Sequence, residues 1–213
     1  MSRYKLVIFD CDGVLVDSET ITNRIFADML NEAGIPASMQ DMQTYFVGNS
    51  LPQCGQIVFD LYGKVLDAGF IEQYKPRRDQ ALKSQLQAVA GVKELLAALR
   101  LPCCVASNSD GDKVREMLTL CDLIQYFDQR IFSAADLGKP KPAPDVYLYA
   151  AATMGFEPAD CLVIEDTHIG VSAAVAAGIT VIGYSGTMPA ERLMNAGASQ
   201  VISHMSEVSG LLS

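Results

Sequence analysis

Four carboxylate side chains follow apolar stretches of the chain in a pattern that suits metal and phosphate chemistry. Asp10 ends a short apolar run near the start of the sequence, and Asp12 follows two residues later. Side chains at such spacing in a strand point to the same side. Glu165 and Asp166 end another apolar run. If the two runs are neighbouring strands, the carboxylates cannot all stay ionised without protonation or a cation, and hard oxygen ligands of this kind suit Mg²⁺.

Hydroxyl, amide and ammonium groups that could hold phosphate oxygens occur at two further places. Ser107 and Asn108 follow an apolar run, where the N–H groups of a strand-to-helix turn can also bind an anion. Lys139 and Lys141 each precede a proline, which restricts the backbone of the residue before it. A fixed lysine beside carboxylates could balance the charge of a transferring phosphoryl group. Each residue alone would be ordinary in a turn or surface loop, so the combination carries the hypothesis.

The elements that must position these residues are short strands that alternate with helices. The runs expected to form strands are 5–10, 102–107, 130–133, 162–166 and 180–184. The amphipathic stretches expected to form helices between or after them are 92–99, 112–119, 144–154 and 170–177. Such alternation predicts an α/β protein with a doubly wound parallel sheet, which is a Rossmann-like core. Ligands bind such sheets outside the carboxyl ends of the strands, where the candidate residues lie.

The segment between the first two expected strands is far too long for a simple crossover, at roughly 90 residues. Its own helical patterns cover residues 19–33, 39–46, 51–61 and 70–86. We therefore expect an inserted α-helical cap domain over residues 16–86. The α/β catalytic core would then comprise residues 1–15 and 87–213.

The composition excludes several classes of function. Half of the 213 residues are hydrophobic and 19% are charged, as in a globular protein. The net charge of −9 disfavours nucleic acid and anionic membranes as partners. Six cysteines without Cys-x-x-Cys spacing and only two histidines make a zinc site improbable. We expect the cysteines to be reduced and buried.

The expected compartment is the cytoplasm. The first residues run straight into a strand-like stretch without the apolar region of a secretory signal. No apolar run reaches the length of a membrane span. We expect the protein to be a monomer or a weak dimer.

Taken in order, these residues resemble the motifs of the haloacid dehalogenase-like hydrolase superfamily. The first motif, Asp-x-Asp-Gly-x-x-x-Asp, matches residues 10–17. The second, an apolar strand ending in Ser or Thr, matches Ser107, and the lysine motif Lys-Pro-x-Pro-Asp matches residues 141–145. The fourth matches Glu165 and Asp166. The inserted segment is similar to the helical cap of the β-phosphoglucomutase and phosphoglycolate phosphatase branch.

The resemblance implies a role for each matched residue. Asp10 would attack phosphorus and form an aspartyl phosphate, and Asp12 would act as general acid and base. The implied Mg²⁺ ligands are Asp10, the backbone carbonyl of Asp12, and Asp166, and Glu165 would either bind the metal as well or lie directly beside its ligands. The implied phosphate-binding residues are Ser107, Asn108 and Lys141. The alternative of Lys139 stays open, although the Pro-x-Pro-Asp that follows favours Lys141.

The expected function is that of a Mg²⁺-dependent phosphatase acting on a small phosphorylated metabolite, such as a sugar phosphate or organic-acid phosphate. One alternative is a β-phosphoglucomutase-like mutase, and another is a catalytically idle binding module. The mutases carry an arginine in a cap loop similar to residues 47–51, where this chain has Leu51, and a histidine where it has Thr22. Both differences weaken the mutase alternative, although Arg77 or Arg78 could supply a phosphate clamp.

Overall fold

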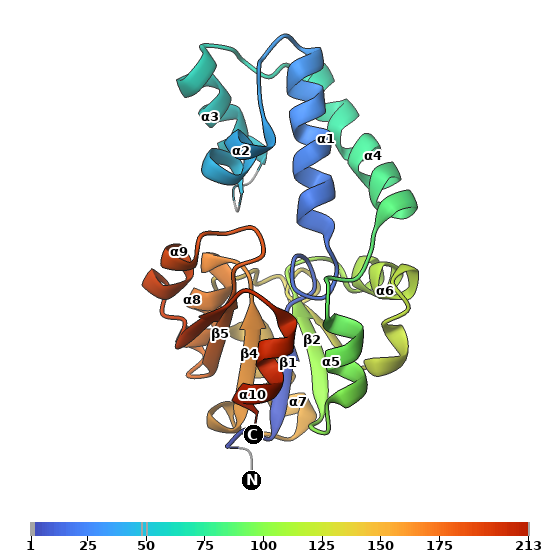
Figure 1. Cartoon of the computed structure of the whole chain (residues 1–213), viewed down its shortest axis with the longest axis vertical. Helices are drawn as coiled ribbons and strands as arrows, with labels where there is room; N and C mark the ends of the chain where they lie inside the picture. The colour runs from blue at the N-terminus through green and yellow to red at the C-terminus, as the bar shows by residue number, and fades with distance from the viewer. Residues whose placement is uncertain (1–2, 48, 50, 213) are drawn as a thin grey trace. The chain divides into compact units, whose positions relative to one another are not determined.

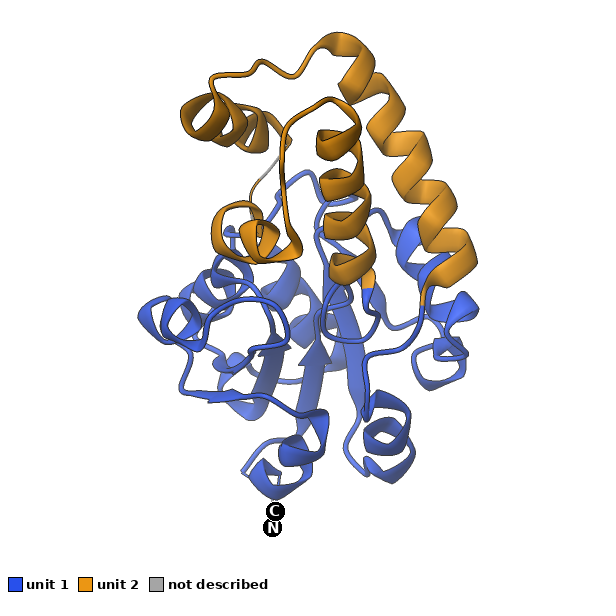
Figure 2. Ribbon diagram, turned by 45° about the horizontal axis from the view of Figure 1, so that its top comes forward, with its two compact units in different colours: residues 1–17, 87–213 blue, residues 18–86 orange. Residues whose placement is uncertain are grey.

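The computed structural model describes residues 3–47, 49 and 51–212 (Figure 1). The chain divides into two compact units, shown in different colours in Figure 2. Unit 1 comprises Met1–Asp17 and Gln87–Ser213, and unit 2 comprises Ser18–Leu86. Within the described part of the chain, no helix combines the length and apolar character that crossing a membrane requires.

Unit 1 is built on a parallel sheet. Its strands are β1 (Leu6–Phe9), β2 (Cys103–Ser107), β3 (Ile131–Ser133), β4 (Cys161–Glu165), β5 (Thr180–Tyr184) and β6 (Gln200–Ile202). Among the described residues they form one sheet in the order β3-β2-β1-β4-β5-β6, and every neighbouring pair is parallel. The central strands β1, β2 and β4 are buried along their whole length, which explains their nearly continuous apolar sequences.

Helices cover both faces of this sheet. They are α5 (Val92–Ala98), α6 (Gly111–Leu120), α7 (Asp145–Met154), α8 (His168–Ala176), α9 (Ala190–Asn195) and α10 (Val208–Leu211). Figure 1 shows α5 and α10 on one face and α7 on the other. α7 packs against β1, β2 and β3 and also contacts α8. The predicted doubly wound α/β fold is confirmed.

The structure adds elements that the sequence patterns did not predict. The edge strand β6, α9 and α10 lie after the last predicted strand. β6 has three residues, of which Ile202 is buried, so it carries too short a pattern for periodicity to detect. Each of the five predicted strands is present, with its ends within a residue or two of the expected positions. All six cysteines are buried and outside disulfides, as expected.

Unit 2 consists of helices and their connections in the described residues. The helices are α1 (Ser18–Glu32), α2 (Met39–Asp41), a π-helix over Met42–Phe46, α3 (Leu51–Tyr62) and α4 (Ala68–Gln85). α1 and α4 lie side by side, and Phe26 of α1 is central to their aromatic packing. Its ring centroid lies 5.6 Å from those of Phe46 and Phe70 and 5.3 Å from that of Tyr74. The helix predicted over residues 39–46 is present as the short α-helix α2, which continues directly into the π-helix.

Candidate active site

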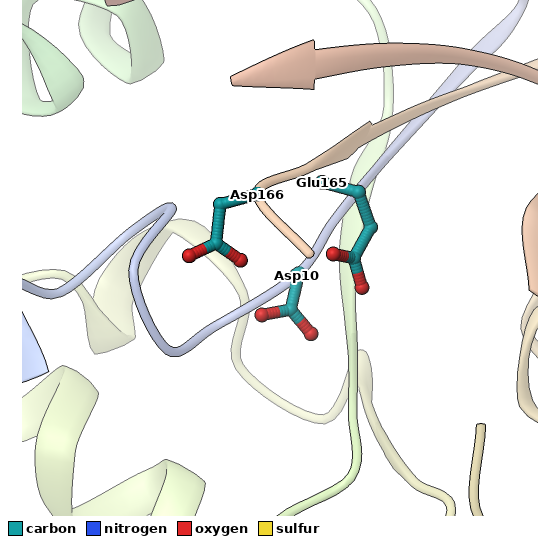
Figure 3. A group of neighbouring side chains, drawn as sticks. All are labelled: Asp10, Glu165 and Asp166. Atoms are coloured by element: carbon teal, nitrogen blue, oxygen red, sulfur yellow. The ribbon is translucent and has the colours of Figure 1, made fainter. Parts of the chain in front are cut away.

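The site forms where the order of strands reverses, between β1 and β4. These strands are neighbours, with Phe9 paired to Ile164, so the residues that follow them emerge side by side. Asp10 follows β1, Glu165 ends β4, and Asp166 comes next. Figure 3 shows the three carboxylates converging, and one oxygen from each lies within 4.8 Å of the others. A doubly wound sheet binds its ligands at such a switch point.

Lys141 lies inside this carboxylate cluster. Its Nζ donates hydrogen bonds to Asp10 Oδ1 at 2.6 Å, to Glu165 Oε1 at 2.7 Å and to the Ala106 carbonyl oxygen at 2.9 Å. An ammonium group has three N–H donors, so these contacts use all of them. Lys139 is exposed and instead forms an ion pair with Asp145 at 2.6 Å. Of the two lysines, Lys141 is the one that the structure places in the cluster.

The cluster holds more negative than positive charge. The buried charged side chains among the described residues are Asp10, Lys141, Glu165 and Asp166. The pKa of Asp10 is raised to about 8, mainly because the carboxylate is buried; Lys141 acts to lower this pKa, and Glu165 and Asp12 act to raise it. Burial acts to lower the pKa of Lys141, but Asp10 and Glu165 outweigh it and hold that pKa well above its usual value. One ammonium therefore does not balance the carboxylates, and a hard divalent cation fits this donor set.

Glu165 is held on both of its oxygens. Besides Lys141, the Tyr147 hydroxyl donates to Oε1 at 3.0 Å. The backbone N–H and the hydroxyl of Thr167 donate to Oε2 at 2.9 and 3.0 Å. The Thr167 hydroxyl also accepts a hydrogen bond from the Gly170 N–H and caps α8. Four donors therefore fix the Glu165 carboxylate among protein groups.

Two glycines make room for the carboxylates. Gly13 has a φ of +78°, which L side chains rarely adopt, and a Cβ there would overlap the Asp166 carboxylate. A Cβ at Gly170 would overlap the Glu165 carboxylate. The glycine of the Asp-x-Asp-Gly motif thus lets the loop after β1 approach Asp166 closely.

The predicted phosphate-binding residues after β2 form a compact loop. Ser107 is buried, and its Oγ accepts a hydrogen bond from the Ser109 N–H at 3.0 Å. Asn108 is exposed, and its Oδ1 accepts from the Lys141 N–H at 2.8 Å, which ties the two loops together. The Ser109 hydroxyl donates to Asp12 Oδ2 at 2.9 Å. The structure therefore brings Ser107 and Asn108 to the strand edge that carries Asp10 and Lys141.

Sequence reasoning missed three side chains of this network. Ser109 lies in the predicted loop after the second strand, where a serine is an ordinary turn residue and gives no signal of its own. Thr167 follows Asp166 directly and had the type of a helix cap. Tyr147 lies on a predicted helix, where an aromatic residue is expected to be simple core. Its position two residues after the lysine motif is the signal that could have found it.

The residues that bear on the mutase alternative lie in unit 2. Arg77 forms a two-point ion pair with Glu32 at 2.6 and 2.7 Å. Arg78 pairs with Asp79 at 2.6 Å. Thr22, Leu51 and Arg78 are among the residues that line a cavity of about 220 Å³. Gly48 and Ser50 of the cap loop lie outside the described residues. Both arginines thus already have carboxylate partners within unit 2.

The fold and the cluster define a doubly wound α/β protein with a buried carboxylate–lysine centre at its switch point. The family model described as haloacid dehalogenase-like hydrolase matches residues 7–184. The chain belongs to the haloacid dehalogenase-like hydrolases, which confirms the resemblance of its motifs.

Individual relatives agree with this assignment. The 6-phosphogluconate phosphatase of Escherichia coli is 32% identical over 182 residues, which are 85% of this chain and 82% of that protein. A haloacid dehalogenase-like protein from Agrobacterium tumefaciens has a TM-score of 0.93 and 39% identity over 98% of this chain and 97% of its own. A family hydrolase from Deinococcus radiodurans, solved with bound phosphate and sodium, has a TM-score of 0.89 and 29% identity over 100% and 99%.

The predicted branch of the superfamily is also confirmed. A Thermotoga maritima protein assigned as a β-phosphoglucomutase has a TM-score of 0.78 and 25% identity over 98% of each chain. A Haemophilus somnus protein assigned as a phosphoglycolate phosphatase shares the fold with a TM-score of 0.82 and 21% identity over 100% of each chain.

Proposed function

We propose that this chain is a Mg²⁺-dependent phosphatase that hydrolyses a small phosphate monoester through a phosphorylated Asp10. The observation that carries the proposal is the buried centre in which Lys141 donates hydrogen bonds to Asp10 and Glu165. The Asp166 carboxylate lies next to these two carboxylates. The similarity to a 6-phosphogluconate phosphatase supports a sugar phosphate or organic-acid phosphate as substrate. The Deinococcus relative was solved with bound phosphate, which supports phosphate as a ligand of proteins with this fold.

The reaction would proceed in two half-reactions at Asp10 and Asp12. An Asp10 carboxylate oxygen forms a bond to phosphorus while the bond from phosphorus to the leaving oxygen breaks, and Asp12 gives its proton to that oxygen. A water then attacks the aspartyl phosphate and passes a proton to Asp12, which releases phosphate and restores both side chains. The hydrogen bond from Ser109 to Asp12 Oδ2 would orient the acid.

The metal ligands that we propose are Asp10, Asp166 and the backbone carbonyl of Asp12. Their hard oxygens and the charge imbalance of the cluster fit Mg²⁺. When bound, Mg²⁺ would neutralise carboxylate charge and polarise a phosphoryl oxygen. We propose that Glu165 does not bind the metal directly, because both of its oxygens accept hydrogen bonds from protein donors.

We propose that Ser107, Asn108 and Lys141 contact the phosphoryl oxygens. Ser107 and Asn108 supply a hydroxyl and an amide at the turn after β2. Lys141 would have to exchange one of its three present acceptors for a phosphoryl oxygen. The Asp10 contact is the natural one to exchange, since Asp10 would itself become bonded to phosphorus.

Unit 2 would serve as the helical cap that selects the substrate, whereas the core performs the chemistry. The mutase alternative needs a strong second anion clamp in this unit. Leu51 cannot bind phosphate, and Arg77 and Arg78 already pair with Glu32 and Asp79. These features favour hydrolysis over phosphoryl return to the sugar.

The testing experiment measures products from a panel of phosphorylated sugars and sugar acids, 6-phosphogluconate included, with and without Mg²⁺. We expect Mg²⁺-dependent release of inorganic phosphate. Efficient conversion of β-glucose 1-phosphate to glucose 6-phosphate, with almost no free phosphate, would support the mutase instead. Binding of panel members without any turnover would support the idle binding module.

A further inference from the structure

Tyr147 contacts both Lys141 and Glu165, which form an ion pair beside Asp10. It is fully buried on α7, with 0% of its surface exposed. Its hydroxyl donates a hydrogen bond to Glu165 Oε1 at 3.0 Å. Lys141 Nζ lies 4.7 Å from the centroid of its ring. One rigid side chain thus contacts both members of the Lys141–Glu165 ion pair.

Each contact has a physical consequence for the ion pair. The ammonium over the ring face gains a cation–π attraction, which is stronger in a desolvated site than at a surface. The hydroxyl supplies Glu165 Oε1 with a second donor besides Lys141, so that oxygen does not depend on Lys141 alone. Together the contacts restrict both side chains, because a Tyr ring has two rotatable bonds and is fixed here by complete burial.

The arrangement also separates the two carboxylates that end β4. Glu165 accepts hydrogen bonds from Lys141, Tyr147 and Thr167, whereas Asp166 lies against the loop at Gly13. A cation at Glu165 Oε1 would meet an ammonium nitrogen only 2.7 Å from that oxygen. Charge repulsion would therefore keep a metal ion toward Asp166 and toward the Asp10 oxygen that does not contact Lys141.

We propose that Tyr147 is a positioning residue, which locks Glu165 onto Lys141 and thereby fixes the Lys141 ammonium against the Asp10 nucleophile. This inference rests on the proposed phosphatase function and goes beyond it, because Tyr147 matches no motif of the family. Tyr147 acts through Glu165 and Lys141 and contacts no reacting atom. Tyr147→Phe removes the hydroxyl and keeps the ring, so it tests the hydrogen bond to Glu165 by itself.

The experiment compares Tyr147→Phe with Tyr149→Phe as a matched control. Tyr149 lies on the same helix but is 51% exposed, and its ring packs edge-on against Phe132. With p-nitrophenyl phosphate and saturating Mg²⁺, we expect Tyr147→Phe to lower kcat about tenfold, as loss of one hydrogen bond to a charged group predicts, with KM changed less than about threefold. Tyr149→Phe should match the wild type.

A double-mutant cycle distinguishes positioning from packing. Because Tyr147 acts through the Glu165 carboxylate, Tyr147→Phe should have less than about a threefold further effect on kcat in a Glu165→Gln background. Equal losses in both backgrounds would assign Tyr147 a packing role and overturn the proposal. A loss confined to KM, or no loss, would overturn it as well.

Binding of beryllium trifluoride, an aspartyl-phosphate mimic, provides a readout without turnover. Calorimetry with Mg²⁺ present measures the affinity for beryllium trifluoride, which we expect Tyr147→Phe to weaken about tenfold. A separate titration with Mg²⁺ should show that the affinity for the metal changes less than about twofold. An unchanged trifluoride affinity would contradict the proposal. If the wild type releases no phosphate from any substrate, the proposed function fails, and this titration still decides the role of Tyr147.

Discussion

At the scale of single residues, the site depends on the charge of Asp10. Its carboxylate is buried, accepts a hydrogen bond from Lys141 and lies close to the carboxylates of Glu165 and Asp166. Asp10→Asn keeps the size and much of the hydrogen bonding but removes the nucleophile and a metal ligand. We expect loss of nearly all turnover with the fold retained, because uncatalysed monoester hydrolysis is too slow to mask the loss. Phosphate release and circular dichroism check this, and substantial activity would reject the covalent mechanism.

The matched control for that substitution is Asp112→Asn. Asp112 is exposed on α6 and is not part of the carboxylate cluster. The phosphatase activity of the Asp112→Asn variant should stay within about twofold of the wild type, since exposed charges contribute little to folding or to a distant site. Equal losses in both variants would indicate a general effect of lowered charge.

Gly13 provides a second prediction at this scale. Because a Cβ at Gly13 would overlap the Asp166 carboxylate, Gly13→Ala must displace either the loop or Asp166. The positive φ adds strain of about 1 kcal/mol or more. We expect Mg²⁺ affinity and turnover to fall at least about tenfold, which calorimetry and phosphate release can measure. Gly55→Ala is the control, since nothing lies within 4 Å of its added Cβ.

At the scale of elements, α8 begins at the residue that fixes Glu165. Thr167 caps this helix through its hydroxyl and also donates twice to the Glu165 carboxylate. Thr167→Ala removes the hydroxyl contacts but leaves the backbone N–H. We expect the free energy of unfolding to fall by about 1–2 kcal/mol, and kcat to fall with it because Glu165 is held less firmly.

Thr167→Ser keeps the hydroxyl and serves as the rescue for that experiment. The free energy of unfolding from chemical denaturation and the kcat of this variant should both be close to those of the wild type, since serine and threonine are similar helix caps. If the serine and alanine variants lose the same activity, the Thr167 methyl group and not its hydroxyl would be the important part.

At the scale of the whole molecule, metal binding and folding should be linked. Excess chelator should abolish activity, and added Mg²⁺ should restore it. A ligand that binds the folded state stabilises it by about 2.7 kcal/mol at one hundred times its dissociation constant, so Mg²⁺ should raise the melting temperature. Asp166→Asn should remove most of this rise. Unchanged turnover in chelator would rule out the metal site.

The pKa of Asp10 predicts how the metal-free protein responds to pH. Its pKa rises from 3.8 to about 8 on folding, mainly through burial, so the folded state favours the protonated form. Its contribution to stability is complete below about pH 4 and is lost as the pH rises toward about 8. In chelator, the wild type should therefore lose stability across this window relative to Asp10→Asn. Parallel melting curves for the two proteins would contradict this assignment.

The sequence alone determined the fold class and the order of the motifs. Buried parallel strands require nearly continuous apolar runs, and carboxylates at the ends of such runs are visible without a structure. The runs before Asp10 and Glu165 therefore predicted β1 and β4 and placed their carboxylates at one sheet edge. The long segment between the first two strands likewise indicated inserted helices. These features are local, so the chain displays them in its residue order.

Only the tertiary structure decided which side chains meet. Lys141 and Asp10 are 131 residues apart in sequence. Lys139 and Lys141 each precede a proline, so only the resemblance of residues 141–145 to the lysine motif favoured Lys141, and the structure shows that Lys141 is the buried one. The contacts of Glu165 with Lys141 and Tyr147 depend on how α7 packs against the sheet. A buried charge must find its partners in three dimensions, and residue type and periodicity do not encode those distances.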